Sequence, residues 1–303
     1  MKLNSTIPRV CSALALALSA GTASAALSSS DSFDTPPYAP GNVAGQGSVD
    51  PFYSGPWGTA SGATDVNVVG TGLTWAGLQT SGGALATGTI PASNSTGRGG
   101  RNLATAWDNT TSGTYYISFL ASFGLAGPAV HHRVIEGWSA PSFPGDGARS
   151  LQVGYSEFTG LGTTLSLSIN NGGGGVNEVD FDNNINIATD NGATHLFVLR
   201  FDLTTAAGGD VVYGYLDPTD LVNEPGSPNA LLFGFDFGLA QFGSMVQFVF
   251  PGDAPNTTGY LDELRFGTSY ADVLPAAIPE PATFSLLGLA GLAFVFRARR
   301  QKA

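Results

Sequence analysis

Three carboxylates stand at alternate positions in the segment Glu178-Val179-Asp180-Phe181-Asp182. Side chains two residues apart on a β-strand point to the same face, so a strand here places Glu178, Asp180 and Asp182 in one row. A retaining glycoside hydrolase uses two carboxyl groups about 5–5.5 Å apart as nucleophile and acid/base. The segment therefore has the residue types for acid/base chemistry on a carbohydrate.

This segment resembles the catalytic strand of concanavalin A-like glycosidases of the laminarinase type, which reads Glu-x-Asp-x-Glu or Glu-x-Asp-x-x-Glu. The resemblance implies that Glu178 is the nucleophile, Asp180 orients it and position 182 is the acid/base. Asp182 stands where that pattern has glutamate, which shortens the reach of the acid by one methylene. We therefore expect a body without catalytic residues, with a laminarinase-like hydrolase as the alternative.

Oxygen ligands for a cation gather at the same place. Carboxylate and amide oxygens at short spacing are the ligands that Ca²⁺ prefers, and the segment supplies Asp180, Asp182, Asn183 and Asn184. A second candidate site pairs the two ends of the body, Asp34 with Asp262 or Glu263. Calcium at either site is expected to stabilise the fold rather than perform chemistry. The alternative for both sites is a set of solvated loop carboxylates.

Other residue types give no catalytic pattern. The three histidines, His131, His132 and His195, lack the spacing of a metal site or a catalytic triad. The segment Gly154–Phe158 lacks the final glycine of a nucleophile elbow. The tryptophans either stack on sugar rings or fill the core; they are Trp57, Trp75, Trp107 and Trp138.

Strands must position these residues, because runs with period-two alternation recur between clusters of Gly, Pro, Asn and Asp. The predicted strands are Asp65–Val69, Tyr115–Phe119, Leu151–Tyr155, Thr164–Ile169, Val176–Phe181, His195–Leu203, Val211–Leu216, Leu231–Phe237, Met245–Phe250 and Tyr260–Phe266. One face of His195–Leu203 carries Phe197, Leu199, Phe201 and Leu203, and one face of the later strand carries Leu231, Phe233, Phe235 and Phe237. No sustained helical period with caps is present. The pattern predicts an all-β fold, with two antiparallel sheets packed as a sandwich.

Residues 1–25 have the features of a secretory signal peptide. Lys2 and Arg9 form the basic region, Ala13 to Ala20 the apolar region, and Ala23-Ser24-Ala25 the cleavage site. Removal of this segment also removes Cys11, the only cysteine, so the mature chain has no disulfide or thiolate. The predicted organisation is a signal peptide at 1–25, a β-sandwich ectodomain at 26–275 and a tail at 276–303.

The tail has three parts in order. Pro279-Glu280-Pro281 precedes the uncharged apolar run Ala282–Phe296, which is short for a membrane-spanning helix. The basic cluster that follows stays on the cytoplasmic side; it consists of Arg297, Arg299, Arg300 and Lys302. The order resembles the PEP-CTERM sorting signal of Gram-negative bacteria. That resemblance implies recognition by an exosortase, a membrane transpeptidase, and transient anchoring in the membrane through the tail. The alternative is a permanent single-span anchor.

The body carries a second resemblance, made of strand patterns. Its residues are the runs Thr194–Asp202, Gly208–Val212 and Leu261–Val273, with Arg101–Trp107 as an earlier match. They resemble the laminin-G-like, concanavalin A-like jelly roll of many bacterial PEP-CTERM proteins. The resemblance implies a two-sheet jelly roll and contact with glycan or matrix, without naming a ligand.

Charge excludes one class of partner. The stretch 26–278 holds 22 acidic residues, six arginines and no lysine, a net charge of −16. Such a body repels phosphate backbones, which excludes nucleic acid. We therefore expect an exported, exosortase-sorted protein of the cell surface or of an exopolysaccharide or biofilm matrix, without enzymatic activity and with polysaccharide as a candidate ligand.

Overall fold

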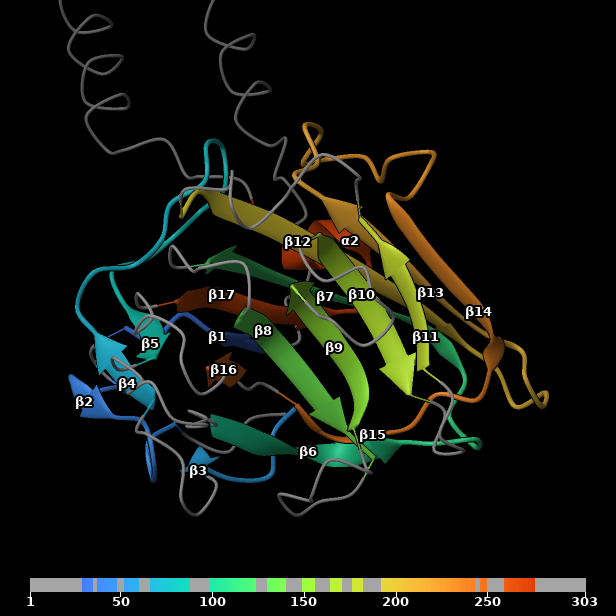
Figure 1. The fold of residues 1–303 in the computed structure, drawn as a ribbon, viewed down its shortest axis with the longest axis horizontal. Helices are drawn as coiled ribbons and strands as arrows, with labels where there is room; N and C mark the ends of the chain where they lie inside the picture. Colours follow the sequence, from blue (N-terminus) through green and yellow to red (C-terminus); the bar gives the residue numbers. More distant parts are fainter. Residues whose placement is uncertain are drawn as a thin grey trace, which may run out of the picture.

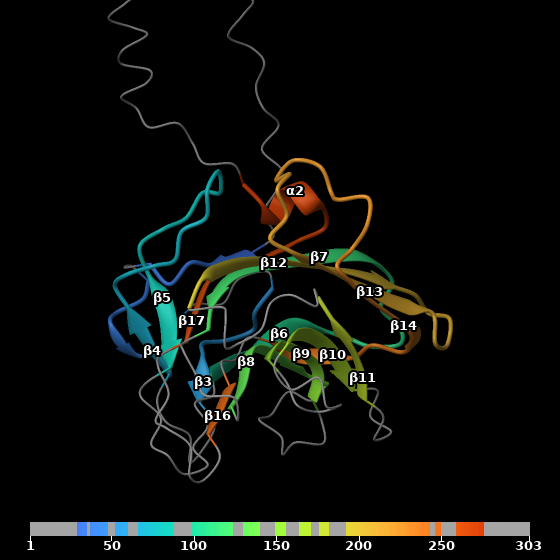
Figure 2. The same ribbon diagram turned by 45° about the horizontal axis from the view of Figure 1, so that its top comes forward.

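The computed structural model is mostly β (Figure 1). The structure describes residues 29–34, 37–47, 52–59, 66–87, 99–123, 130–139, 149–155, 164–170, 176–181, 192–242, 246–249 and 259–275. Two antiparallel sheets, one of nine and one of eight described strands, pack face to face, as Figure 2 shows. The predicted all-β jelly-roll sandwich of two antiparallel sheets is confirmed.

The nine-stranded sheet brings the two ends of the body together. Its strand order is β14 (Ala230–Phe235), β13 (Asp210–Leu216), β12 (Thr194–Leu203), β7 (Gly113–Ser122), β17 (Tyr260–Gly267), β5 (Ala84–Thr87), β4 (Val66–Val69) and β2 (Gly41–Asn42). The N-terminal strand β1 (Ser29–Asp31) pairs with β17, opposite Phe266 to Leu264. Strands from the start and the end of the described chain are therefore neighbours.

The eight-stranded sheet carries the carboxylate segment at one edge. Its order is β11 (Val176–Asp180), β10 (Leu165–Asn170), β9 (Arg149–Tyr155), β8 (Val130–Trp138), β15 (Leu239–Phe242), β6 (Gly99–Trp107) and β3 (Gly58–Thr59). The short strand β16 (Val246–Val249) also pairs with β8. Glu178 and Asp180 thus lie on β11, the last strand of this sheet.

The main core lies between the two sheets and follows the predicted alternation. Phe197, Leu199, Phe201 and Leu203 of β12 are all buried in it. Phe119 of β7 stacks on Phe197 with ring centroids 4.9 Å apart. The opposite sheet contributes a matching set from β9 and β10: Leu151, Val153, Leu165, Leu167 and Ile169. Burial of these apolar faces is the main force that holds the two layers together.

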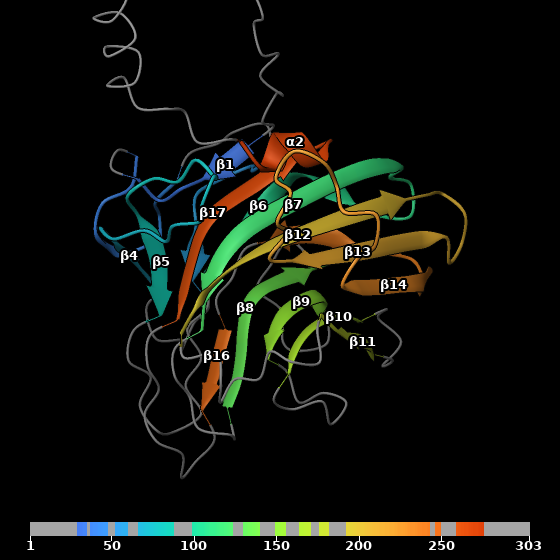
Figure 3. The same ribbon diagram turned by 90° about the horizontal axis from the view of Figure 1, so that it is seen from above.

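A second apolar cluster, which the sequence did not reveal, covers the outer face of the nine-stranded sheet. Leu196, Val198 and Tyr215 pack there against the short helix α2 (Tyr270–Val273), shown in Figure 3. The Ser269 side chain accepts a hydrogen bond from the Asp272 amide and begins the helix in a capping box. A single helical turn is too short to show a period, which is why the sequence pattern did not predict it.

All ten predicted strands are present, with ends that differ by at most three residues. Strands made mainly of small residues were not predicted, such as β5 (Ala84–Thr87) and β6 (Gly99–Trp107), because Gly, Ala and Thr give little apolar alternation. Among the described residues, no helix has the length and apolar character needed to cross a membrane.

The predicted face of Leu231, Phe233, Phe235 and Phe237 is wrong. Phe233 is 69% exposed and Leu231 41%, whereas Phe235 and Phe237 are buried. The pairing of β13 with β14 shifts between Asp210 and Val211, so that Gly234 is an extra residue on β14. Gly234 has φ +85°, in the left-handed region. This bulge reverses the side-chain alternation, because each inserted residue exchanges the two faces of a strand.

Candidate functional site

The outer face of β9, β10 and β11 is the candidate site, and strand alternation creates it. Odd residues of β9 and β10 fill the core, and Val179 of β11 packs against it. The even residues therefore point the other way. We call this set the polar face; it consists of Ser150, Gln152, Ser166, Ser168, Glu178 and Asp180.

Both described carboxylates of the polar face accept hydrogen bonds from hydroxyl groups at β10. The Ser166 hydroxyl donates to Glu178 Oε1 at 2.6 Å, and the Thr164 hydroxyl donates to Asp180 Oδ1 at 2.8 Å. Both carboxylates are half-buried. The hydroxyl bonds fix two acceptors at one edge of the face.

Gln152 lies in the same row as Glu178. The register pairs Ser168 with Gln152 on one side and with Glu178 on the other. Gln152 is only 4% exposed, yet its Oε1 atom has no hydrogen-bond partner among the described residues. A buried acceptor without a donor costs roughly 1–3 kcal/mol. The row therefore has a buried acceptor that a water molecule would satisfy.

The structure does not bring a second carboxylate opposite Glu178. Glu178 and Asp180 are on one strand, and the neighbouring strand β10 contains no acidic residue. Asp182, the expected acid/base, lies outside the described residues, and so do Asn183 and Asn184. The described residues therefore form a set of hydrogen-bonding groups. Glu178 is present as one member of an acid/base pair, without a described partner carboxylate opposite it.

No group of three or more His, Cys, Asp or Glu side chains in the described part of the chain is placed to hold a metal ion. Asp34 and Asp262, the second predicted site, both contact the loop 70–83. Asp34 Oδ1 accepts a hydrogen bond from the Gly82 amide, and Asp262 Oδ2 accepts one from the Leu73 amide, both at 2.7 Å. These carboxylates anchor the loop 70–83 to the sandwich, and calcium at residues 180–184 remains a prediction.

Glu263 and Arg265 complete this anchor. Glu263 accepts hydrogen bonds from the Ser81 amide and hydroxyl and pairs with Arg265 Nη2 at 2.6 Å. Burial, followed by the neighbouring Glu263 carboxylate, raises the pKa of Asp262 to about 9. Burial also lowers the pKa of Arg265. Asp262, Glu263 and Arg265 therefore form a buried cluster, in which loss of hydration favours the neutral forms of Asp262 and Arg265.

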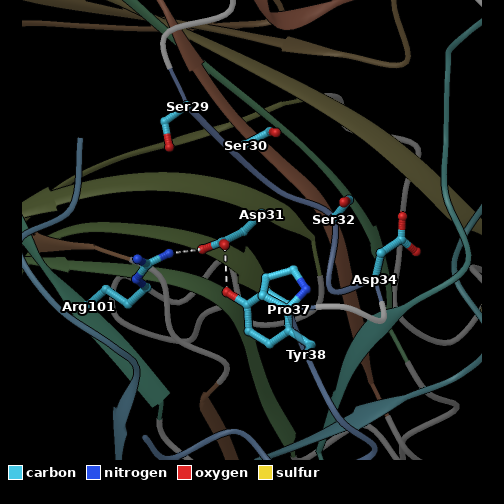
Figure 4. Close-up of a pocket in the computed structure, with 8 residues that line it drawn as sticks. All are labelled: Ser29, Ser30, Asp31, Ser32, Asp34, Pro37, Tyr38 and Arg101. Carbon is cyan, nitrogen blue, oxygen red and sulfur yellow. Dashed lines mark hydrogen bonds and ion pairs between the residues drawn. The ribbon is translucent and has the colours of Figure 1, made fainter. Parts of the chain in front are cut away.

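A second buried ion pair, which sequence reasoning missed, lies beside a hollow (Figure 4). Arg101 Nη1 contacts Asp31 Oδ2 at 2.6 Å, and the Tyr38 hydroxyl donates to Asp31 Oδ1 at 2.5 Å. The Arg101 guanidinium also lies over the Tyr53 ring, 3.9 Å from its centroid. The hollow of 180 Å³ is lined by Ser29, Ser30, Asp31, Ser32, Asp34, Pro37, Tyr38 and Arg101.

This ion pair joins the two sheets, since Asp31 belongs to β1 and Arg101 to β6. Burial raises the pKa of Tyr38, and the Asp31 carboxylate raises it further. Burial opposes the charge of Arg101, but the Asp31 carboxylate outweighs it, and the net pKa of Arg101 is raised. The sequence does not indicate this pair by spacing, because its partners lie 70 residues apart. Its only indication was the scarcity of arginine in the body.

The tail decides what kind of protein this is. Residues 277–300 match the PEP-CTERM protein-sorting motif. This chain carries a PEP-CTERM sorting signal. The match includes Pro279, Glu280 and Pro281 and the basic residues Arg297, Arg299 and Arg300, while Lys302 follows it. The signal marks an exported, exosortase-processed protein, as predicted; its residues lie outside those that the structure describes.

No curated protein matches this PEP-CTERM chain. Similar solved structures include the T. cruzi calreticulin globular domain, at 13% identity and a TM-score of 0.41 over 70% of this chain and 84% of that one. The lectin UEA-II complexed with galactose has 12% identity and a TM-score of 0.38, over 68% of this chain and 90% of that one. Alginate lyase vAL-1 from Chlorella virus has 12% identity and a TM-score of 0.40, over 67% of this chain and 93% of that one. These are similarities in the path of the backbone, and no activity of this chain follows from them.

The remaining candidate side chains are the tryptophans and histidines, and the structure describes only some of them. Trp57 and Trp107 are buried in the main core, and Trp75 packs against the second cluster. His195 Nδ1 lies 2.7 Å from Asp217 Oδ2 at the start of β12. The side chains of His131, His132 and Trp138 lie outside the described residues. Trp57 and Trp107 therefore fill the core, which was the alternative to sugar stacking, and Trp75 is half-buried.

Proposed function

We propose that this protein is an exosortase-sorted component of the cell surface or extracellular matrix that contacts polysaccharide through the polar face, without enzymatic activity. The observation that carries the proposal is the row Gln152, Ser168 and Glu178. It places an amide, a hydroxyl and a carboxylate across three adjacent strands; Gln152 and Ser168 are buried and Glu178 is half-buried, so a sugar would meet the row at its β11 edge. Groups of this kind are the hydrogen-bonding partners of sugar hydroxyls.

The contact at each copy is weak. The serines and Gln152 of the polar face are buried, which leaves Glu178 and Asp180 as its half-buried groups, and the buried tryptophans Trp57 and Trp107 are not available to stack on a sugar ring. Many copies held at one surface compensate, because linked binding sites gain avidity without new contacts. A low affinity for each site suits a protein that lies within a polysaccharide layer.

Binding of the mature protein to immobilised polysaccharides tests this function. Glu178→Ala removes the half-buried acceptor of the row and should weaken retention on the polysaccharide that wild type binds. Ala104→Leu on β6 is the control, since that exposed side chain is not on the polar face. Equal retention of Glu178→Ala and wild type would contradict a role for the polar face.

A laminarinase-like hydrolase is the alternative, favoured by the position of Glu178 and Asp180 on one face of a strand. We expect no release of reducing ends from laminarin, agar, carrageenan or xylan. Activity that disappears in Glu178→Gln, while binding persists, would establish the hydrolase instead.

A further inference from the structure

The folded body ends very close to the sorting motif. The Pro275 carbonyl accepts a hydrogen bond from the Gln79 amide at 2.9 Å. The two preceding residues, Val273 and Leu274, are buried in the second apolar cluster. The chain is therefore fixed to the sandwich up to Pro275, the last residue that the structure describes.

The motif begins at residue 277, and its Pro-Glu-Pro triplet begins at Pro279. A fully extended chain advances at most about 3.6 Å per residue, so Pro279 lies within about 14 Å of Pro275. An enzyme that acts at the triplet must work within this distance of the folded body. So short a tether leaves no room for a second folded domain between the body and the enzyme.

The surface around Pro275 is formed by three segments, which we call the α2 face. They are the loops 73–80 and 217–224 and the helix region 268–275, which contains α2. The Tyr270 hydroxyl donates to the Asp220 carbonyl at 2.9 Å, and Leu78 and Leu221 join the same apolar cluster. Figures 1 to 3 show α2 on the outer side of the nine-stranded sheet, away from the polar-face sheet.

One carboxylate of the α2 face is exposed, that of Asp220, which accepts hydrogen bonds from Val222 and Asn223 of its own loop, and the others have partners elsewhere. The three segments of the face contain no lysine or arginine. Asp272 caps the helix, Glu224 accepts from Tyr116, Tyr215 and Arg200, and Asp217 contacts His195. Val222, by contrast, is 73% exposed. A face of this kind has one exposed carboxylate to desolvate when it meets another protein.

We propose that the α2 face is the surface that the folded body presents to its sorting enzyme while the 277–300 motif is processed. This inference rests on the proposed sorting and adds to it a contact outside the motif. The competing arrangement is that α2 unfolds to lengthen the tether. That arrangement must expose Tyr270, Val273 and Leu274, all of which are buried.

Ala271→Arg in the full-length chain, in its exosortase-bearing host, tests the contact. Ala271 is an exposed residue of α2, and an unpaired guanidinium in the contact should slow removal of the tail by about tenfold. Thr105→Arg, at an exposed position of β6 in the other sheet, is the matched control and should be processed at the wild-type rate. Thermal melting checks that both variants are folded.

A spacer of ten Gly and Ser residues between Pro275 and Ala276 completes the test. It should restore normal processing of Ala271→Arg, because the body then no longer touches the enzyme. Processing of Ala271→Arg at the wild-type rate without the spacer would overturn the inference, as would slow processing that the spacer leaves unchanged. A wild-type chain that keeps its whole tail would instead overturn the sorting itself, and the inference with it.

Discussion

Asp31 and Asp262 are both buried carboxylates, but they differ in the groups that surround them. Asp31 contacts the Arg101 guanidinium and the Tyr38 hydroxyl. Asp262 accepts from two backbone amides and has the carboxylate of Glu263 as its neighbour. A sequence shows that acidic residues are present, but it does not show which of them fold inward. For that reason the sequence suggested Asp34 and Asp262 only as cation ligands and did not show that they accept hydrogen bonds from the loop 70–83.

Replacing Arg101 by methionine should destabilise the fold strongly. The substitution keeps much of the side-chain volume but leaves Asp31 buried without its cation, and removing one partner of a buried pair costs roughly 3–5 kcal/mol. Chemical denaturation measures the change in the free energy of unfolding.

Arg200→Met is the control for Arg101→Met. Arg200 pairs with Asp202 and Glu224 at the surface, with 29% of its side chain exposed, so its loss should cost about 1 kcal/mol or less. Equal losses for the two variants would show that the Asp31–Arg101 pair has no special role.

Asp262 should make the protein less stable as the pH rises. Its pKa is raised from the ordinary 3.8 to about 9, so in the folded state it keeps a proton that the unfolded chain releases. The stabilisation is complete below the ordinary pKa and is lost progressively as the pH rises toward about 9. Melting temperatures in chelator-containing buffers from pH 5 to pH 9 measure this slope.

Asp262→Asn should flatten that slope, because the amide does not titrate. The control is Asp220→Asn, since hydrogen bonds from Asn223 and Val222 lower the pKa of this exposed carboxyl and place its titration below the window. A wild-type slope that persists in Asp262→Asn would assign it to other groups.

At the scale of elements, the pattern of apolar residues predicted ten strands and the core face of β12. It failed at β14, since Leu231, Phe233, Phe235 and Phe237 alternate in sequence as in a regular strand. The bulge at Gly234 depends on pairing with β13, which lies 20 residues earlier in the chain. The polar face was predicted only as far as Glu178 and Asp180, because the contribution of Gln152 depends on the register of three strands.

Gly234→Ala tests the bulge. Alanine in the left-handed region costs about 1–2 kcal/mol, and the Cβ atom would meet nothing within 4 Å, so backbone strain alone is measured. Gly226→Ala is the matched control, because that glycine also has open space around it but no positive φ. A loss of unfolding free energy should occur for Gly234→Ala only. Equal effects would contradict the assigned backbone conformation.

Calcium should stabilise the segment that follows β11. The oxygen ligands Asp180, Asp182, Asn183 and Asn184 belong to a body of strongly negative charge. An ion at 100 times its dissociation constant stabilises the folded state by about 2.7 kcal/mol. Melting of chelator-treated protein with and without millimolar Ca²⁺ measures the effect, with Asp180→Asn expected to reduce it. An unchanged melting temperature would exclude the site.

For the whole molecule, composition and alternation were enough to predict two antiparallel sheets, because each sheet must bury one apolar face. They did not predict the second apolar cluster, which forms because β7 and β12 are buried on both faces. This cluster fixes the chain up to Pro275 and so determines where the tail leaves the body. The fold and the sorting signal are thereby connected through α2.

The central claim is that the tail directs exosortase processing of an exported surface protein, and mass spectrometry of the mature protein tests it most directly. The protein is isolated from its native host with the exosortase expressed. The chain should begin after Ala25 and end near Pro279-Glu280-Pro281, without the apolar run and the basic cluster. A mature chain that still ends at Ala303 would contradict the claim.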